Sequence, residues 1–93
     1  MSKVRLDIFT PSVEFFSGEI ESLIVRTIDG DEGFLPGHSW ANELLAENGI
    51  VKIREPGQKQ FKTARTTGGY VEIRDHFVVF TENAEWVDDG SGV

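Results

Sequence analysis

The acidic segment from Asp29 to Glu32 is the part of the sequence whose side chains most resemble a ligand-binding site. Three carboxylates in four residues could hold Ca²⁺ in a loop. An EF-hand loop needs oxygen ligands at positions 1, 3, 5 and 12 and a glycine at position 6. Counted from Asp29, position 5 is Gly33, position 6 is Phe34 and position 12 is Trp40, so the pattern fails at three places. We expect no metal site, and the segment is either a solvated loop or a contact with another protein.

The remaining candidates for catalysis are sparse. The sequence has no cysteine, and its two histidines, His38 and His76, are too far apart for a local metal-binding pair such as H-x-x-x-H. No glycine motif of the phosphate-binding kinds occurs, so we interpret Gly68-Gly69 as a close approach between strands. A lone loop histidine such as His38 usually serves hydrogen bonding or packing. We therefore predict a protein that is not an enzyme and holds no cofactor.

The charge of the chain argues against nucleic acid as a partner. The 93 residues carry a formal net charge of −7. Residues 1–49 carry three basic and nine acidic side chains, whereas residues 50–76 carry six basic and three acidic. This basic middle third could form a nucleic-acid-binding surface, but the overall charge favours a solvated face or an acidic protein partner. No apolar run approaches the length that spans a bilayer.

Strand-like patterns recur along the chain and predict an all-β fold. Val4, Leu6 and Ile8 alternate with other residues, and a period of two is typical of a strand with one buried face. Further strands are expected at 13–16, 20–28, 50–54, 60–64, 70–74 and 77–81, with turns at Ser17-Gly18, Pro56-Gly57 and Asp75-His76 and a loop at 29–33. Many short strands at even spacing favour a flattened sandwich of roughly ten strands.

At most one short helix is expected in this fold. Ser39 could cap a helix running to Asn48, in which Trp40 and Leu44 share a face. The predicted core consists of Leu6, Ile8, Phe16, Leu23, Val25, Leu35, Ile53, Phe61, Val71, Ile73, Val79 and the neighbourhood of Phe80. We assign residues 1–85 to one β-sandwich domain and expect the acidic residues 86–93 to be a frayed tail.

An ordered set of short motifs over about residues 3–85 resembles one protein family. The motifs are Thr10-Pro11, Phe16-Ser17-Gly18-Glu19-Ile20, Asp29-Gly30-Asp31, Gly33-Phe34-Leu35-Pro36-Gly37-His38, Gly49-Ile50-Val51-Lys52-Ile53, Gly68-Gly69-Tyr70-Val71-Glu72-Ile73 and the run from Val78 to Glu85. Together they are similar to the N-terminal β-sandwich domain of the ε subunit of F-type ATP synthases, which is called δ in mitochondria. The family commonly adds a C-terminal helical hairpin that regulates ATP hydrolysis. Since the sequence stops at Val93, neither this regulation nor ATP binding is carried over.

The resemblance implies a non-catalytic subunit of the central stalk, or rotor. It would dock the γ subunit onto the membrane c-ring and help to couple proton translocation to ATP synthesis. Relatives place the residue matching Asp31 at the c-ring and the residue matching His38 close to γ. We expect the c-ring contact to comprise Asp29, Gly30, Asp31 and Glu32, and the γ contact to comprise Thr10, Pro11, His38 and Trp40. The location would be peripheral, on the cytoplasmic face of the inner (plasma) membrane or its organellar equivalent, with the membrane reached only through the complex.

Two alternatives stay open from the sequence. The chain could be a free-standing β-sandwich interaction module with a changed partner, because Ser39-Trp40-Ala41 stands where the family usually has Ala-Pro-Leu. Trp40 could anchor a partner, as exposed aromatic residues often do, or it could pack on its own helix through Leu44.

Overall fold

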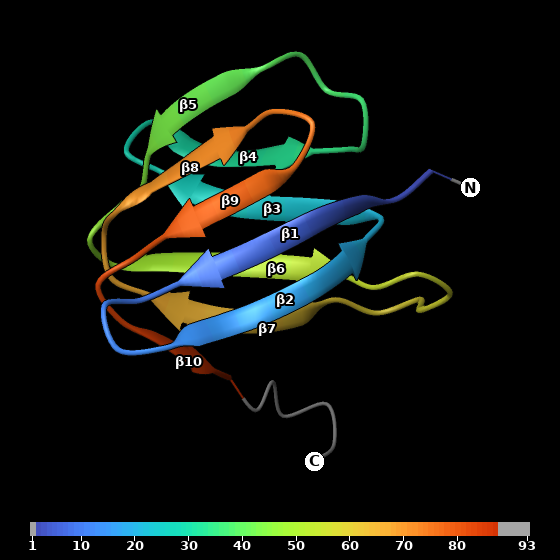
Figure 1. Cartoon of the computed structure of the whole chain (residues 1–93). Coiled ribbons are helices and arrows are strands. Elements are labelled where there is room, and N and C mark those ends of the chain that lie inside the picture. Colours follow the sequence, from blue (N-terminus) through green and yellow to red (C-terminus); the bar gives the residue numbers. More distant parts are fainter. Residues whose placement is uncertain (1, 88–93) are drawn as a thin grey trace.

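Two five-stranded sheets pack face to face in the computed structural model, which describes residues 2–87 (Figure 1). The first sheet, sheet A, contains β1 (Val4–Phe9), β2 (Glu14–Ile20), β5 (Ala41–Leu44), β8 (Tyr70–Ile73) and β9 (Phe77–Phe80). Sheet B contains β3 (Ser22–Thr27), β4 (Gly30–Phe34), β6 (Gly49–Arg54), β7 (Lys62–Thr66) and β10 (Ala84–Trp86). The strand orders are β2-β1-β9-β8-β5 and β10-β7-β6-β3-β4, and β1 and β9 form the parallel pair. The predicted all-β sandwich is thus confirmed.

The sheets are linked along both of their long edges. On one side, the Phe15 ring of β2 lies against Trp86 of β10 in a tilted arrangement, with 4.6 Å between the ring centres. On the other side, the Ile28 amide donates to the Leu44 carbonyl at 3.1 Å and the Ala46 amide donates to the Arg26 carbonyl at 3.0 Å. Strand β5 is therefore tied to the β3–β4 hairpin as well as to β8.

The core between the sheets follows the period of two that the sequence shows. Most of the predicted core side chains are completely buried: Leu6, Ile8, Leu23, Val25, Ile53, Val71, Ile73 and Val79. Phe16, Phe61 and Phe80 are only partly buried. The expectation for Leu35 is wrong, because Leu35 is 60% exposed and its neighbour Phe34 is completely buried. Phe34 is the last residue of β4 and pairs with the buried Leu23. Because side chains alternate along a strand, Phe34 points into the core and Leu35 does not.

The helix expected over 39–48 is not formed, and β5 occupies its middle. Ala41 to Leu44 pair with Ile73 to Tyr70 of β8. A helix of about ten residues is marginal on its own, whereas the exposed edge of β8 offers unpaired backbone groups to an extended chain. As a result Trp40 and Leu44 do not pack together in a helix, and both are well exposed.

Two other expected boundaries differ in the structure. Strand β2 runs straight through Ser17-Gly18, where a turn was expected, because these residues pair with Asp7 and Leu6 of β1. At the other end, β10 includes Trp86, and the Val87 amide donates to the Thr63 carbonyl at 2.8 Å. These two residues of the expected tail are therefore bonded to β7, and residues 88–93 lie outside the described residues. Within residues 2–87, no helix is long and apolar enough to cross a membrane.

Candidate protein-contact surface

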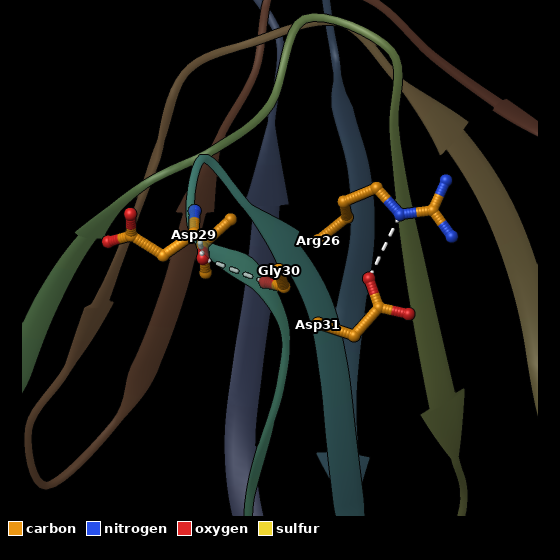
Figure 2. Close-up of polar contacts among 5 residues, drawn as sticks. Arg26, Asp29, Gly30 and Asp31 are labelled. Carbon is orange, nitrogen blue, oxygen red and sulfur yellow. Dashed lines mark hydrogen bonds and ion pairs between the residues drawn. The ribbon is translucent and has the colours of Figure 1, made fainter.

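The acidic segment is a tight hairpin rather than the expected loop over 29–33 (Figure 2). Ile28 and Asp29 form a two-residue turn between β3 and β4, and Gly30 has a φ of 120°, which favours glycine. The Thr27 hydroxyl donates to the Gly30 carbonyl at 2.8 Å and accepts from the Asp29 amide at 3.0 Å. These bonds hold the turn in one shape and leave the Asp29 side chain and the 63%-exposed Ile28 at its tip.

The three carboxylates of the segment lie in different places. Asp31 is on the outer face of sheet B, where its carboxylate accepts a hydrogen bond from Arg26 Nε at 2.9 Å (Figure 2). Glu32 is on the opposite face of β4 from Asp31, the face that turns toward the core, and it pairs with the buried Val25. Asp29 is at the turn, away from the Arg26–Asp31 pair in Figure 2. Among residues 2–87, no group of three or more metal-binding side chains is close enough to hold an ion.

The pairing with Arg26 lowers the pKa of Asp31 below its ordinary value of 3.8. The hydrogen bond from Arg26 is the largest cause. Desolvation acts in the opposite direction, and the positive charges of Arg26 and Lys52 lower the pKa further. Because both side chains are exposed, solvent screens the pair. At neutral pH, Asp31 is therefore ionised but largely matched by a charge of its own chain.

We predict that Arg26→Gln raises the pKa of Asp31 back toward 3.8, since the main cause of the shift is removed. The check is an NMR pH titration of the Asp31 carboxyl carbon in both proteins. A lowered pKa means that the pair stabilises the fold above the unfolded pKa, and that this contribution is lost as pH falls through the folded pKa. Lys52→Gln is the control and should shift the pKa less. An unchanged Asp31 pKa in Arg26→Gln would contradict the pairing.

A row of apolar side chains crosses the outer face of sheet A. Its members are direct cross-strand neighbours: Leu44 of β5, Tyr70 of β8, Phe80 of β9 and Phe9 of β1. The Tyr70 and Phe80 rings stack with centres 4.9 Å apart, and Phe80 and Phe9 stack at 5.6 Å. Leu44 and Tyr70 are 60% and 40% exposed, so this apolar row is open to solvent.

A groove of about 570 Å³ lies beside the apolar row. Phe9, Tyr70 and Phe80 line it together with Thr10-Pro11 and Gly68-Gly69. Gly69 has a φ of 98°, and a Cβ atom on it would lie 1.8 Å from the Phe80 carbonyl oxygen. The prediction of a close backbone approach at Gly68-Gly69 is therefore confirmed for Gly69, and the approach shapes the wall of the groove.

The structure divides the predicted site residues between two ends of the sandwich. Thr10 and Pro11 border the groove, and the apolar row runs from there to Leu44. The Leu44 carbonyl accepts a hydrogen bond from the Ile28 amide. Ile28 precedes the acidic segment, and residues 28–32 are called the acidic turn. Thr10-Pro11 and the acidic turn are thus at the same end, where β1, β3, β5 and β9 finish (Figure 1).

His38 and Trp40 lie at the opposite end, between the end of β4 and the start of β5 (Figure 1). The His38 ring meets Phe34 edge-on at 4.8 Å, and its Nδ1 is 2.6 Å from the Ser39 carbonyl oxygen. His38 therefore has the packing role expected of a lone loop histidine. Trp40 is 66% exposed, with the Arg74 guanidinium 5.4 Å from its ring centre.

The sequence interpretation did not single out the apolar row. A signal for it was present in Phe77-Val78-Val79-Phe80, which is apolar at every position. In an antiparallel sheet with one solvated face, such a run places apolar side chains on both faces. The outward residues Val78 and Phe80 could have been identified in this way.

Sequence comparison identifies a matching family. The family model described as "ATP synthase, Delta/Epsilon chain, beta-sandwich domain" matches residues 3–87. An ATP synthase epsilon chain of Alkaliphilus metalliredigens is 34% identical over 89 residues, covering 95% of this chain and 64% of that one. The epsilon chain of Frankia casuarinae is 36% identical over 70 residues, covering 75% of this chain and 80% of that one. The chain spans less than two thirds of the length of the Alkaliphilus relative.

Solved structures with the same fold come from mitochondrial ATP synthases. A chain of the Euglena gracilis enzyme superposes with a TM-score of 0.84 at 19% identity, over 97% of this chain and 57% of that one. A chain of the Tetrahymena thermophila central stalk and c-ring gives a TM-score of 0.73 at 14% identity, over 90% of this chain and 66% of that one. At these identities the similarity supports the fold.

Proposed function

The chain belongs to the delta/epsilon β-sandwich family of ATP synthases, and on this basis we propose that it is a non-catalytic rotor subunit of an F-type ATP synthase. In this role it docks the γ subunit onto the c-ring and helps to couple proton translocation to ATP synthesis. It acts at the membrane as a peripheral subunit, on the cytoplasmic face or its organellar equivalent. The structural observation that carries the docking role is the exposed apolar row, since contiguous apolar surface is typical of protein-binding sites.

The γ subunit, in this proposal, covers the outer face of sheet A. The apolar row and Thr10-Pro11 supply the contact at one end, and His38 and Trp40 supply it at the other. The principal extents of the domain are 32 × 28 × 26 Å. An interface of ordinary size covers about 800 Å² on each partner, which corresponds to a patch roughly 30 Å across. One partner can therefore contact both ends.

We predict that Tyr70→Ala weakens binding of purified γ by about 2 kcal/mol, or about 30-fold. The Tyr70 ring joins Leu44 to Phe80 at the centre of the apolar row, and aromatic side chains at interface centres contribute most to affinity. Isothermal titration calorimetry measures the change. Ile50→Ala, at a half-buried side chain of β6 in sheet B and away from the proposed interface, should bind like the parent chain.

Trp40→Ala tests the other end of the same interface and should also weaken γ binding while the fold persists. Because Trp40 is 66% exposed, its removal leaves no cavity in the core. If Tyr70→Ala and Trp40→Ala both bound γ with the parent affinity, the proposed docking face would be incorrect.

The acidic turn is the part of the chain that we propose rests on the polar loops of the c-ring. Asp29 is at the tip, and Asp31 and Glu32 follow on opposite faces of β4. Charge-complementary contacts of this exposed kind mainly set orientation and association rate, at about 0–1 kcal/mol for each pair. Asp29 is the strongest single contributor, because it forms no ion pair within residues 2–87, whereas Asp31 is already matched by Arg26.

Replacing Asp29, Asp31 and Glu32 together by lysine is predicted to weaken coupling without unfolding the domain. The reversal adds repulsion against basic c-ring loops, by up to about 1 kcal/mol for each position. ATP-driven proton pumping by membrane vesicles, divided by their ATPase rate, measures the coupling.

A charge-matched control replaces Glu55, Asp75 and Glu85, which lie outside the turn, by lysine. Coupling should stay at the parent level in this control. Equal coupling in the parent enzyme and the acidic-turn variant would count against the c-ring contact.

A further inference from the structure

The groove beside the apolar row combines aromatic rings with negative charge. Phe9, Tyr70 and Phe80 line its apolar part, and Glu47 and Glu82 also line it. No lysine, arginine or histidine is among its lining residues. An aromatic ring carries partial negative charge on its face, so the rings and the carboxylates both favour a cation.

The two glutamates have no basic partner in the described part of the chain. The ion pairs found within residues 2–87 do not include Glu47 or Glu82. Both residues are exposed. The Glu47 carboxylate extends over Gly68, with Oε2 3.0 Å from the position that a Cβ on Gly68 would take. The carboxylate therefore lies against the glycine wall of the groove, where it can accept hydrogen bonds from an incoming group.

We propose that this groove receives an arginine side chain of the γ subunit. A guanidinium group is planar, stacks on aromatic faces and donates paired hydrogen bonds to carboxylates, which matches the stacked rings and the two glutamates. The inference rests on the proposed function, because γ supplies the side chain. Residues 88–93 of the chain itself carry two aspartates and no basic residue, so by charge they are poor occupants.

The first experiment tests the groove without γ. The tripeptide acetyl-Gly-Arg-Gly-amide is titrated into the ¹⁵N-labelled 93-residue chain at low salt, with acetyl-Gly-Gln-Gly-amide as the control peptide. Amide signals at Gly68, Gly69 and Glu82 are expected to shift with the arginine peptide only. The shifts should disappear in the Glu47→Gln, Glu82→Gln double variant. Shifts that persist in this variant, or that follow acidic residues all over the surface, would overturn the proposal.

The second experiment measures γ binding by calorimetry. The Glu47→Gln, Glu82→Gln double variant should bind γ about 5- to 30-fold more weakly than the parent, and its affinity should depend less on salt. The charge-matched control Asp75→Asn, Glu85→Gln alters acidic residues outside the groove and should bind like the parent chain.

The outcomes separate the inference from the proposed function. If γ binds the parent and both double variants equally, the arginine site is wrong and the rotor assignment stands. If the arginine peptide occupies the groove and γ does not bind the parent chain, the groove chemistry stands and the rotor assignment fails. A dimer of the 93-residue chain that sedimentation detects, and that the Glu47→Gln, Glu82→Gln variant abolishes, would assign the groove to a second copy and overturn the proposal.

Discussion

Replacing Gly69 by alanine is expected to destabilise the domain by more than about 4 kcal/mol, which places it in the rare class of very damaging substitutions. A Cβ atom at this position would lie 1.8 Å from the Phe80 carbonyl oxygen and 2.8 Å from the Thr81 Cα. These are backbone atoms, so no side-chain rotation relieves the clash. Gly69 also has a φ of 98°, which adds strain for any other residue.

The space at Gly69 matters because two strands depend on it. Tyr70 of β8 pairs with Phe80 of β9, and the Leu45 amide donates to the Gly69 carbonyl at 2.9 Å. Moving the backbone apart would weaken the pairing of β8 with β9 and the attachment of the segment after β5. Guanidinium unfolding followed by circular dichroism measures the loss of stability.

Gly57→Ala is the matched control for this substitution. Gly57 also has a positive φ, of 81°, but no atom lies within 4 Å of its Cβ position. Its replacement should cost only the conformational strain, of about 1 kcal/mol. If Gly69→Ala unfolded at the same denaturant concentration as Gly57→Ala, the close approach would not exist.

Truncating Phe34 to alanine is expected to cost about 3–5 kcal/mol. The Phe34 side chain is completely buried between the sheets, where its ring lies 6.4 Å from that of Phe77. Removing it loses apolar burial and leaves a cavity that the paired strands cannot readily close. For a domain of this size each kcal/mol lowers Tm by about 4–8 °C, so a fall of at least about 12 °C is expected.

The neighbouring variant Leu35→Ala provides an internal control. Leu35 is 60% exposed and follows the end of β4, so its truncation should change Tm by no more than about 4 °C. Differential scanning calorimetry of both variants gives the comparison. A larger fall in Tm for Leu35→Ala than for Phe34→Ala would mean that Leu35, and not Phe34, points into the core.

This pair of residues also shows how far the sequence alone could predict the fold. Alternation identified the strand around Leu6, because its buried side chains Val4, Leu6 and Ile8 share one parity. The strand around Val25 was identified by its apolar run Leu23-Ile24-Val25. In Gly30–Phe34 the inward positions are a glycine, a glutamate and a phenylalanine, and such a strand at the sheet edge carries almost no apolar alternation. The strand was therefore expected to be a loop, and Leu35 was placed in the core.

The segment over 39–48 was misassigned for a different reason. Its local pattern, with Ser39 as a cap and Trp40 and Leu44 four residues apart, fits a short helix. The competing partner is the edge of β8, some 30 residues later in the sequence. Local propensity cannot register such a partner, and pairing with it outweighs a marginal helix.

The candidate site was only partly predictable. The acidic segment from Asp29 to Glu32 was identified from its own charges, and Thr10-Pro11 through the family resemblance. Their positions at one end of the sandwich required the structure. The apolar row depends on the register of β5, β8, β9 and β1, which brings residues from four distant segments into line. The neutralising contact between Arg26 and Asp31 likewise depends on the register of one hairpin.

Site-specific photocrosslinking in the assembled ATP synthase tests the rotor assignment most directly. A photoreactive phenylalanine analogue is placed at position 70 in the apolar row, at position 29 in the acidic turn, or at position 63 in β7 of sheet B. We predict that position 70 crosslinks to γ, that position 29 crosslinks to the c subunit, and that position 63 crosslinks to neither. Crosslinking of position 63 to γ without any from position 70, or no product with γ or c from any position, would contradict the assignment.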